Sequence, residues 1–135
     1  MIWNTTRLVE FQHCDPAGIV FYPRYVEMVN SVVEEFFREA LDYAFGPMHA
    51  VDHKGVPTAR ISLEFQEPGF LEDPLDFKLV VARLGKSALD LEIACTSRGA
   101  PRFTAQSTLV QVDMATRKST PWPDKMRRVI EGADK

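Results

Sequence analysis

Hydrophobic and polar residues alternate along residues 3–11, and this two-residue period is typical of a β-strand with one buried face. The period changes between residues 23 and 42, where apolar side chains recur at intervals of three and four positions. Such spacing places them on one face of an amphipathic helix of about twenty residues, with most charged side chains on the other face. We therefore expect a strand followed by one long helix that lies against a larger apolar surface.

Alternation returns after residue 56 in four further runs, which we interpret as strands. They cover residues 59–65, 75–81, 89–95 and 103–112. The segments between them are rich in Gly, Pro and polar residues, and two are short enough for hairpins, which favours antiparallel neighbours. Residues 43–56 contain Gly46-Pro47 and Gly55 and are predicted to form a loop, whereas residues 123–131 are predicted to form a short helix.

One strand, a long helix and four more strands predict an α+β fold. In this arrangement a curved antiparallel sheet of about five strands wraps around one long central helix, as in the hotdog fold. The 135 residues leave no room for a second core of ordinary size, so we expect a single domain that spans residues 1–135.

Composition narrows the classes of function. A formal net charge of −3 lacks the basic excess that is typical of nucleic-acid binding. We find neither a run of about 20 apolar residues nor a signal peptide, and we expect a cytoplasmic protein without a membrane span. Cys14 and Cys95 form no metal-type pair. His49 and His53 have a spacing that could hold a metal ion on a helix, but no third ligand accompanies them, and we expect no metal.

The candidate chemistry lies where the first strand ends and the long helix begins. Asp15 is followed by Pro16 and Gly18, which break the strand, and Pro23 suits the first turn of a helix. The unpaired N–H groups of that helix would lie near the carboxylate, an arrangement that suits acyl transfer. The alternative is that Asp15 only opens an Asx-type turn. His13 would share a strand face with Asp15, either to assist proton transfer or simply as a hydrogen-bonded strand end.

The run from Asp15 to Pro23, Asp-Pro-Ala-Gly-Ile-Val-Phe-Tyr-Pro, resembles the active-site signature of the 4-hydroxybenzoyl-CoA thioesterase family of hotdog acyl-CoA thioesterases. Within that family it is similar to the clade whose catalytic acid is an Asp just before the central helix. The resemblance implies that Asp15 acts on the thioester carbonyl, as nucleophile or as general base for water. It also implies that the backbone N–H of Tyr22 donates to the carbonyl oxygen.

The resemblance extends to the residues that would hold the substrate. The expected acyl-binding residues are His13, Gly18, Ile19, Val20, Phe21 and Tyr25. Lys86 and Ser87 match a position where relatives contact the CoA phosphates, and two basic residues near hairpin ends, Arg83 and Arg102, are candidates for the same role.

We therefore expect an acyl-CoA thioesterase that releases a carboxylic acid and free CoA. The acyl group is expected to be aromatic, such as 4-hydroxybenzoyl, or a short- to medium-chain aliphatic group. CoA would be part of the substrate, with no separate cofactor. Acyl carrier protein is an alternative acyl carrier, and the resemblance implies a homo-oligomer, a dimer or a tetramer of two dimers, with sites at subunit interfaces. The rival interpretations are a hotdog dehydratase or hydratase and a non-catalytic module that binds acyl-CoA or acyl carrier protein.

Overall fold

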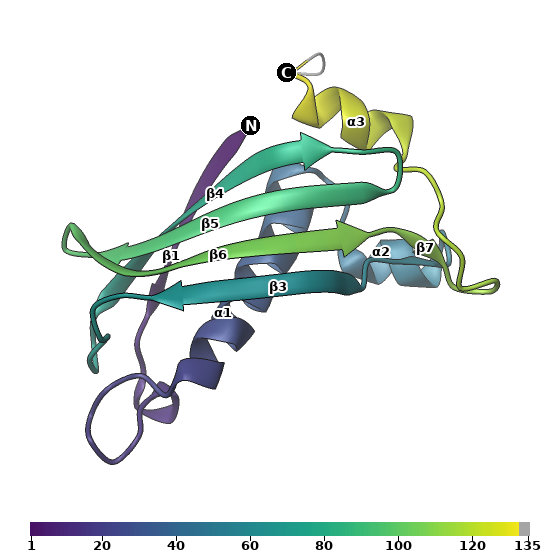
Figure 1. Cartoon of the computed structure of the whole chain (residues 1–135). Helices are drawn as coiled ribbons and strands as arrows, with labels where there is room; N and C mark the ends of the chain where they lie inside the picture. Colours follow the sequence, from purple (N-terminus) through teal and green to yellow (C-terminus); the bar gives the residue numbers. More distant parts are fainter. Residues whose placement is uncertain (133–135) are drawn as a thin grey trace.

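The computed structural model describes residues 1–132. Its main sheet has five antiparallel strands in the order β1-β4-β5-β6-β3, and α1 lies across one face of this sheet (Figure 1). In chain order the elements are β1 (Ile2–Leu8), η1 (Phe11–His13), α1 (Tyr22–Glu35), η2 (Phe36–Ala40), α2 (Phe45–Ala50), β2 (Lys54–Gly55), β3 (Thr58–Phe65), β4 (Pro74–Leu84), β5 (Ala88–Ser97), β6 (Ala100–Val110), β7 (Val112–Asp113) and α3 (Asp124–Ile130). The predicted α+β class and the five-stranded antiparallel sheet are confirmed.

The long helix forms as predicted, with one irregularity. The α-helix begins at Tyr22 and passes at Glu35 directly into a π-helical turn, η2. Two adjacent side chains of that turn, Phe36 and Phe37, are fully buried. A regular α-helix would turn neighbouring side chains by about 100°. The wider π turn lowers this angle, and both rings pack into the core between helix and sheet, as the adjacent pair Val32 and Val33 does in the regular part of the helix.

The first strand is shorter than predicted. It ends at Leu8, and Phe11 lies in a 3₁₀ turn with its side chain 83% exposed. The chain leaves the sheet because Val9 is fully buried and its backbone bonds to a neighbouring loop: Val9 N–H donates to Asp73 O, and Glu72 N–H donates to Val9 O. The alternating pattern of the sequence continues beyond residue 8, but the strand does not.

Residues 43–56 are also more regular than predicted, since they contain α2 and the short strand β2. Met48 of α2 is fully buried, and Phe45 packs on Phe37 with 5.3 Å between ring centroids. A six-residue helix has little stability of its own, so these tertiary contacts are what hold it. The C-terminal helix α3 forms as predicted, after Pro123.

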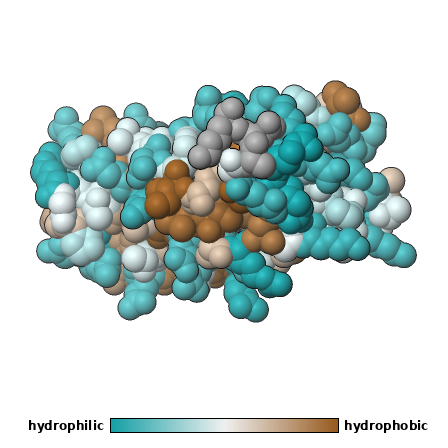
Figure 2. Space-filling model, turned by 90° about the horizontal axis from the view of Figure 1, so that it is seen from above, coloured by the Kyte–Doolittle hydropathy of each residue, from teal (hydrophilic) through white to brown (hydrophobic). Residues whose placement is uncertain are grey.

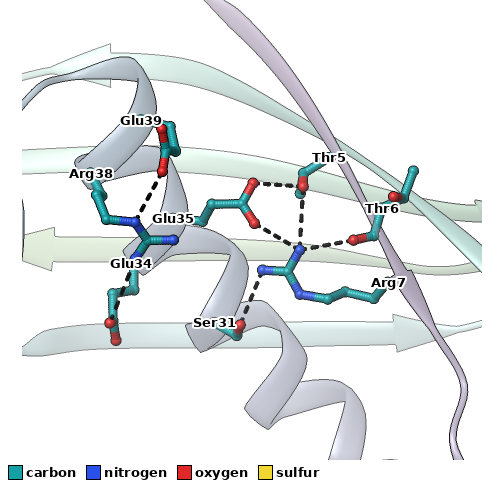
Figure 3. Close-up of polar contacts among 8 residues, drawn as sticks. All are labelled: Thr5, Thr6, Arg7, Ser31, Glu34, Glu35, Arg38 and Glu39. Carbon is teal, nitrogen blue, oxygen red and sulfur yellow. Dashed lines mark hydrogen bonds and ion pairs between the residues drawn. The ribbon is translucent and has the colours of Figure 1, made fainter.

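A polar network joins β1 to α1 (Figure 3). Arg7 Nη1 lies 2.9 Å from Glu35 Oε1, and Thr5 Oγ1 donates to the other carboxylate oxygen of Glu35 at 2.7 Å. Arg7 also donates to Ser31 Oγ at 3.1 Å. Because these groups come from two elements, they fix the angle at which the edge strand crosses the helix.

The face shown in Figure 2 is largely hydrophilic, with a compact hydrophobic area in its middle and smaller hydrophobic spots near its edges. Within residues 1–132, no helix combines the length and the apolar character that crossing a membrane requires.

Candidate active site

A tight turn presents Asp15 directly before α1. Asp15 N–H donates to Ile19 O at 3.0 Å, and Gly18 N–H donates to Asp15 O at 2.9 Å. Pro16 fits the turn because it needs no N–H donor there, and Gly18 adopts a φ of 80°, which a side chain would disfavour. Cys14 and Val20 close the turn as an antiparallel bridge. In the following, the Asp15 turn means residues 14–20.

The two carboxylate oxygens of Asp15 have different surroundings. Oδ1 accepts a hydrogen bond from Ala17 N–H at 2.9 Å, which is an Asx turn. Within the described part of the chain, Oδ2 accepts no hydrogen bond, and the side chain is half-buried. The turn and the catalytic interpretations are therefore compatible, because one oxygen fixes the loop and the other stays available for chemistry.

Tyr22 occupies the first position of α1, where a backbone N–H has no acceptor within the helix. Pro23 has no N–H, and Arg24 N–H donates to Phe21 O at 2.8 Å. Within the described residues, Tyr22 N–H is the donor that remains without a hydrogen-bond partner at this helix end. Phe21 N–H donates to His13 O at 2.9 Å and so ties the helix start to the segment before the Asp15 turn.

Exposed aromatic rings surround the helix start. Phe21 and Tyr22 meet edge to face with 5.5 Å between ring centroids, and Tyr22 meets Phe65 of β3 in the same way at 6.0 Å. These rings are 43%, 60% and 48% exposed. Phe70, half exposed, lies beside the turn because Ile19 forms a bridge with it. Phe65 and Phe70 escaped the sequence analysis, because nothing in their local pattern shows that they lie near Asp15.

Tyr25 and Val20, expected to contact the acyl group, belong to the core instead. They are 4% and 8% exposed. The Tyr25 ring packs on Phe103 at 4.6 Å, and its hydroxyl lies against Gly69. Burial raises the pKa of Tyr25 to about 12, so the hydroxyl stays protonated at neutral pH. Without rearrangement these two side chains support the Asp15 turn from below rather than line a binding surface.

His13 does not share a strand face with Asp15, because it ends the 3₁₀ turn η1 rather than a strand. Its Nδ1 accepts a hydrogen bond from Glu10 N–H at 2.8 Å, which places the ring proton on Nε2. The side chain lines a separate groove between β1 and α1, together with Arg7 and Arg24. The prediction that His13 and Asp15 share a strand face is wrong, because β1 ends at Leu8.

The four residues expected to bind CoA do not form one patch. Lys86 and Ser87 lie in the β4–β5 turn, and Arg83 is exposed just before it. Arg102 lies near the β5–β6 turn, at the other end of the sheet (Figure 1). The ten residues of β5 separate the two ends by about 30 Å. The Asp15 turn lies at the same end as Arg102, since Val20 N–H donates to Gly69 O near the start of β4.

Arg102 is buried, with 8% of its surface exposed, and binds Asp73 rather than facing solvent. Asp73 accepts hydrogen bonds from three donors: Arg98 Nη1 at 2.6 Å, Arg102 Nη2 at 3.3 Å and Phe70 N–H at 2.9 Å. Burial acts to raise the pKa of Asp73, but these hydrogen bonds outweigh it and hold the pKa below its usual value. We therefore leave Arg102 out of the CoA-binding set. Asp73 was not predicted, because its partner Arg102 is distant in the sequence and the pair leaves no local signal.

Across residues 1–132, no three His, Cys, Asp or Glu side chains come together as a metal site. His49 and His53 are separated by the end of α2, and His49 Nδ1 lies 2.7 Å from Phe45 O, its hydrogen-bond partner.

Comparison with known proteins places these features in a family. A family model described as the Thioesterase-like superfamily matches residues 9–130. A curated relative, 1,4-dihydroxy-2-naphthoyl-CoA hydrolase of Nostoc punctiforme, is 24% identical over 142 residues, which cover 100% of this chain and 95% of the relative. Curated relatives of the chain are thus named as CoA hydrolases.

Solved structures agree in fold. A 1,4-dihydroxy-2-naphthoyl-CoA thioesterase from Synechocystis superposes with a TM-score of 0.91 at 18% identity, covering 100% of this chain and 99% of that one. A gentisyl-coenzyme A thioesterase superposes with a TM-score of 0.84 at 22% identity, covering 93% and 99%. The family match spans almost the whole chain, including the Asp15 turn and α1, and the chain therefore belongs to the Thioesterase-like superfamily.

Proposed function

We propose that this protein is an acyl-CoA thioesterase of the 4-hydroxybenzoyl-CoA thioesterase type, which hydrolyses a thioester to a carboxylic acid and free CoA. One observation carries the proposal: at the start of α1, Asp15 Oδ2 and Tyr22 N–H both have no hydrogen-bond partner within the described residues. Thioester hydrolysis needs these two groups, one to attack or to activate water and one to stabilise the oxyanion. Membership of the superfamily supports this assignment.

Asp15 can act in two ways, as a nucleophile or as a general base. As nucleophile, Oδ2 attacks the carbonyl carbon, the C–S bond breaks, CoA leaves as thiolate, and water hydrolyses the resulting anhydride. As general base, Oδ2 takes a proton from water while the water oxygen attacks, and that proton passes to the departing thiolate. In either route Tyr22 N–H donates to the oxyanion, which contributes on the order of 3 kcal/mol to transition-state stabilisation. The positive end of the α1 dipole favours the same negative charge.

An aromatic acyl group fits the surroundings of this site. Phe21, Tyr22 and Phe65 present exposed rings in edge-to-face contact, and a further flat ring packs well against such a set. The naphthoyl-CoA named for the Nostoc and Synechocystis proteins is aromatic as well. We propose a hydroxybenzoyl-type or larger aromatic substrate, with short- or medium-chain aliphatic acyl-CoA as the competing class.

The proposed enzyme is a homodimer that pairs through β3. This strand lies at the edge of the sheet, and its outer edge offers unpaired backbone groups. A groove between β3 and α1 is lined by apolar and polar side chains, and two of the apolar ones, Ile61 and Val26, are 40% and 37% exposed. Antiparallel pairing with a second copy, centred on Ser62, would place Arg60 opposite Glu64 of that copy. The strand is thus complementary to itself, as a two-fold interface requires.

The dimer also resolves the separation between Asp15 and the β4–β5 turn. Antiparallel pairing of β3 brings opposite ends of the two sheets together. The β4–β5 turn of the second copy would therefore lie at the end that holds the Asp15 turn of the first. In this proposal Lys86, Ser87 and Arg83 bind the CoA phosphates of a substrate held by the other subunit. Assembly of dimers into a tetramer and use of acyl carrier protein stay predictions.

The experiment is hydrolysis of a panel of aromatic and aliphatic acyl-CoA esters, followed by free thiol release. Asp15→Asn is the sharpest variant, because its amide oxygen can still accept from Ala17 N–H while the charge is lost. We expect kcat to fall by about 10²- to 10⁴-fold with ester binding retained. Asp52→Asn, at an exposed acid in the segment after α2, is the matched control and should be fully active.

Each outcome of this experiment discriminates between functions. Retained hydrolysis in Asp15→Asn would exclude the mechanism, and a preference for aliphatic esters would exclude the aromatic substrate class. Ester binding by the unmodified protein without any thiol release would favour a binding module, whereas hydration or dehydration of the acyl chain would favour a dehydratase or hydratase.

A further inference from the structure

A β-bulge turns Arg102 into the protein. In the β5–β6 register Cys95 lies opposite Phe103 and Thr96 lies opposite Pro101, so Arg102 is the extra residue with no partner across the ladder. Such a bulge re-aims a side chain that simple alternation would direct elsewhere. Arg102 is consequently buried and meets Asp73, which is 5% exposed, at the end of the sheet beside the Asp15 turn.

The backbone next to Asp73 holds the Asp15 turn from both sides. Before the turn, Val9 N–H donates to Asp73 O at 2.9 Å. At the last residue of the turn, Val20 N–H donates to Gly69 O at 2.9 Å. The segment 69–73 is therefore the support on which both arms of the turn rest, and the Asp73 side chain fixes its shape by accepting from Phe70 N–H.

The ion pair is poorly suited to a role in stability alone. Two buried opposite charges contribute little net stability compared with apolar residues of the same volume. Moreover, within the described chain Arg102 Nε is buried without a hydrogen-bond partner, which adds a desolvation cost. What the pair does supply is a link between two segments, because Asp73 accepts from Phe70 N–H of its own segment and from Arg102 of β6 at the same time.

We propose that Arg102 and Asp73 are positioning residues, which hold segment 69–73 and through it the orientation of the Asp15 carboxylate. This inference rests on the proposed function for Asp15. The clamp, meaning Arg102 and Asp73, touches no substrate. It acts before the reaction, by fixing the backbone that carries Asp15, and a small displacement of such a group is enough to slow catalysis strongly.

The test is Arg102→Met, which keeps much of the side-chain volume and removes the guanidinium. We expect kcat to fall by about tenfold to a hundredfold while KM changes by less than about threefold, since binding is spared. Amide hydrogen exchange should become faster in residues 13–21 and stay unchanged in residues 85–90. Lys54→Met is the control, because Lys54 pairs with Asp113 in the β2–β7 ladder, outside the clamp. It should alter neither readout.

A double variant separates positioning from stability. Arg102→Met combined with Asp73→Asn removes both buried charges, so the melting temperature should recover relative to either single variant. If the clamp positions Asp15, kcat stays low in the double variant. Recovery of kcat together with the melting temperature would overturn the proposal. Arg102→Lys should restore part of kcat, because one cationic donor returns.

The two proposals can fail separately. If the unmodified protein hydrolyses no ester, the proposed function fails, and hydrogen exchange still tests the clamp. Unchanged exchange in residues 13–21 of Arg102→Met would then overturn the clamp, whereas faster exchange confined to those residues would support it.

Discussion

Asp15 shows how one residue combines a structural and a chemical role. Its Oδ1 accepts from Ala17 N–H and closes the turn, which leaves Oδ2 without a partner in the described chain. A freely rotating carboxylate would lose rotamer entropy on reaching a reactive geometry, whereas this one is already held. Close packing also occurs beneath the turn, where the missing side chain of Gly69 leaves room for the Tyr25 hydroxyl.

The tight contact at Gly69 gives a prediction at the residue scale. A Cβ at this position would collide with the Tyr25 hydroxyl and approach Val20 Cγ2 to 3.1 Å. Both neighbours are buried, so Gly69→Ala should lower the free energy of unfolding by about 1–3 kcal/mol. Urea denaturation measures this change. Gly46→Ala, at a site in α2 with nothing within 4 Å, is the control and should be neutral or slightly stabilising. A stability loss equal in both variants would contradict the argument.

At the scale of elements, the position of α1 decides what its first residue can do. The helix is fixed by its buried stripe against the sheet and by the Arg7–Glu35 network at the edge strand (Figure 3). Because the network ties the helix to β1, the whole element, and with it Tyr22 N–H, keeps its direction relative to the sheet. The helix start is an orphan donor only as long as this packing keeps other acceptors away.

The network gives the element-scale prediction. Glu35→Gln removes the charge from a pair whose side chains are only 21–23% exposed, so we expect a loss of about 1 kcal/mol in the free energy of unfolding. The loss should shrink at high salt, because the pair in the unmodified protein is partly screened. Glu34→Gln on the same helix is the matched control: this residue is half exposed and lies 4.0 Å from Arg38, so less than about 0.5 kcal/mol should be lost. Equal losses in the two variants would show that burial of the pair is irrelevant.

At the scale of the whole molecule, the sheet separates two sets of groups. The Asp15 turn lies at one end and the β4–β5 turn at the other, about 30 Å away. In one chain Lys86 lies far from Asp15, whereas in the proposed antiparallel dimer through β3 the β4–β5 turn of the second copy would lie at the end that holds Asp15. The edge of the sheet is thus as much a part of the proposed site as the turn itself.

A charge exchange on β3 tests this assembly. Arg60→Glu alone would place like charges opposite each other twice in the dimer, so we expect the dissociation constant to rise about tenfold. Glu64→Arg alone should have the same effect. The double exchange, Arg60→Glu with Glu64→Arg, should restore dimerisation, because the pairs are reversed but intact. Sedimentation velocity over a range of concentrations measures the effect. Pairing about Ser62 would be contradicted if the unmodified protein stays monomeric, or if the double exchange dimerises as weakly as the single variants.

The sequence by itself determined the helix, the strands and the candidate acid. The three-to-four-residue period of α1 and the alternation in β4, β5 and β6 are set by burial of one face, which shows locally in the sequence. The run from Asp15 to Pro23 is local as well, because a turn and a helix start depend on neighbouring residues. The prediction failed at Phe11, where the local alternation continues but no neighbouring strand pairs with it. It also failed in α2, where contacts with distant residues form a helix in a segment whose own sequence favours a loop.

Only the tertiary structure decided the surroundings of the acid. Arg102 looked like a surface cation at a hairpin end, but a one-residue bulge buries it against Asp73, from a loop 29 positions away in the chain. Tyr25 was expected to line a pocket, and the structure buries its ring against Phe103. These outcomes depend on strand register and on which loops meet at one end of the sheet. Register is a property of pairs of segments, and it has no signature in either segment alone.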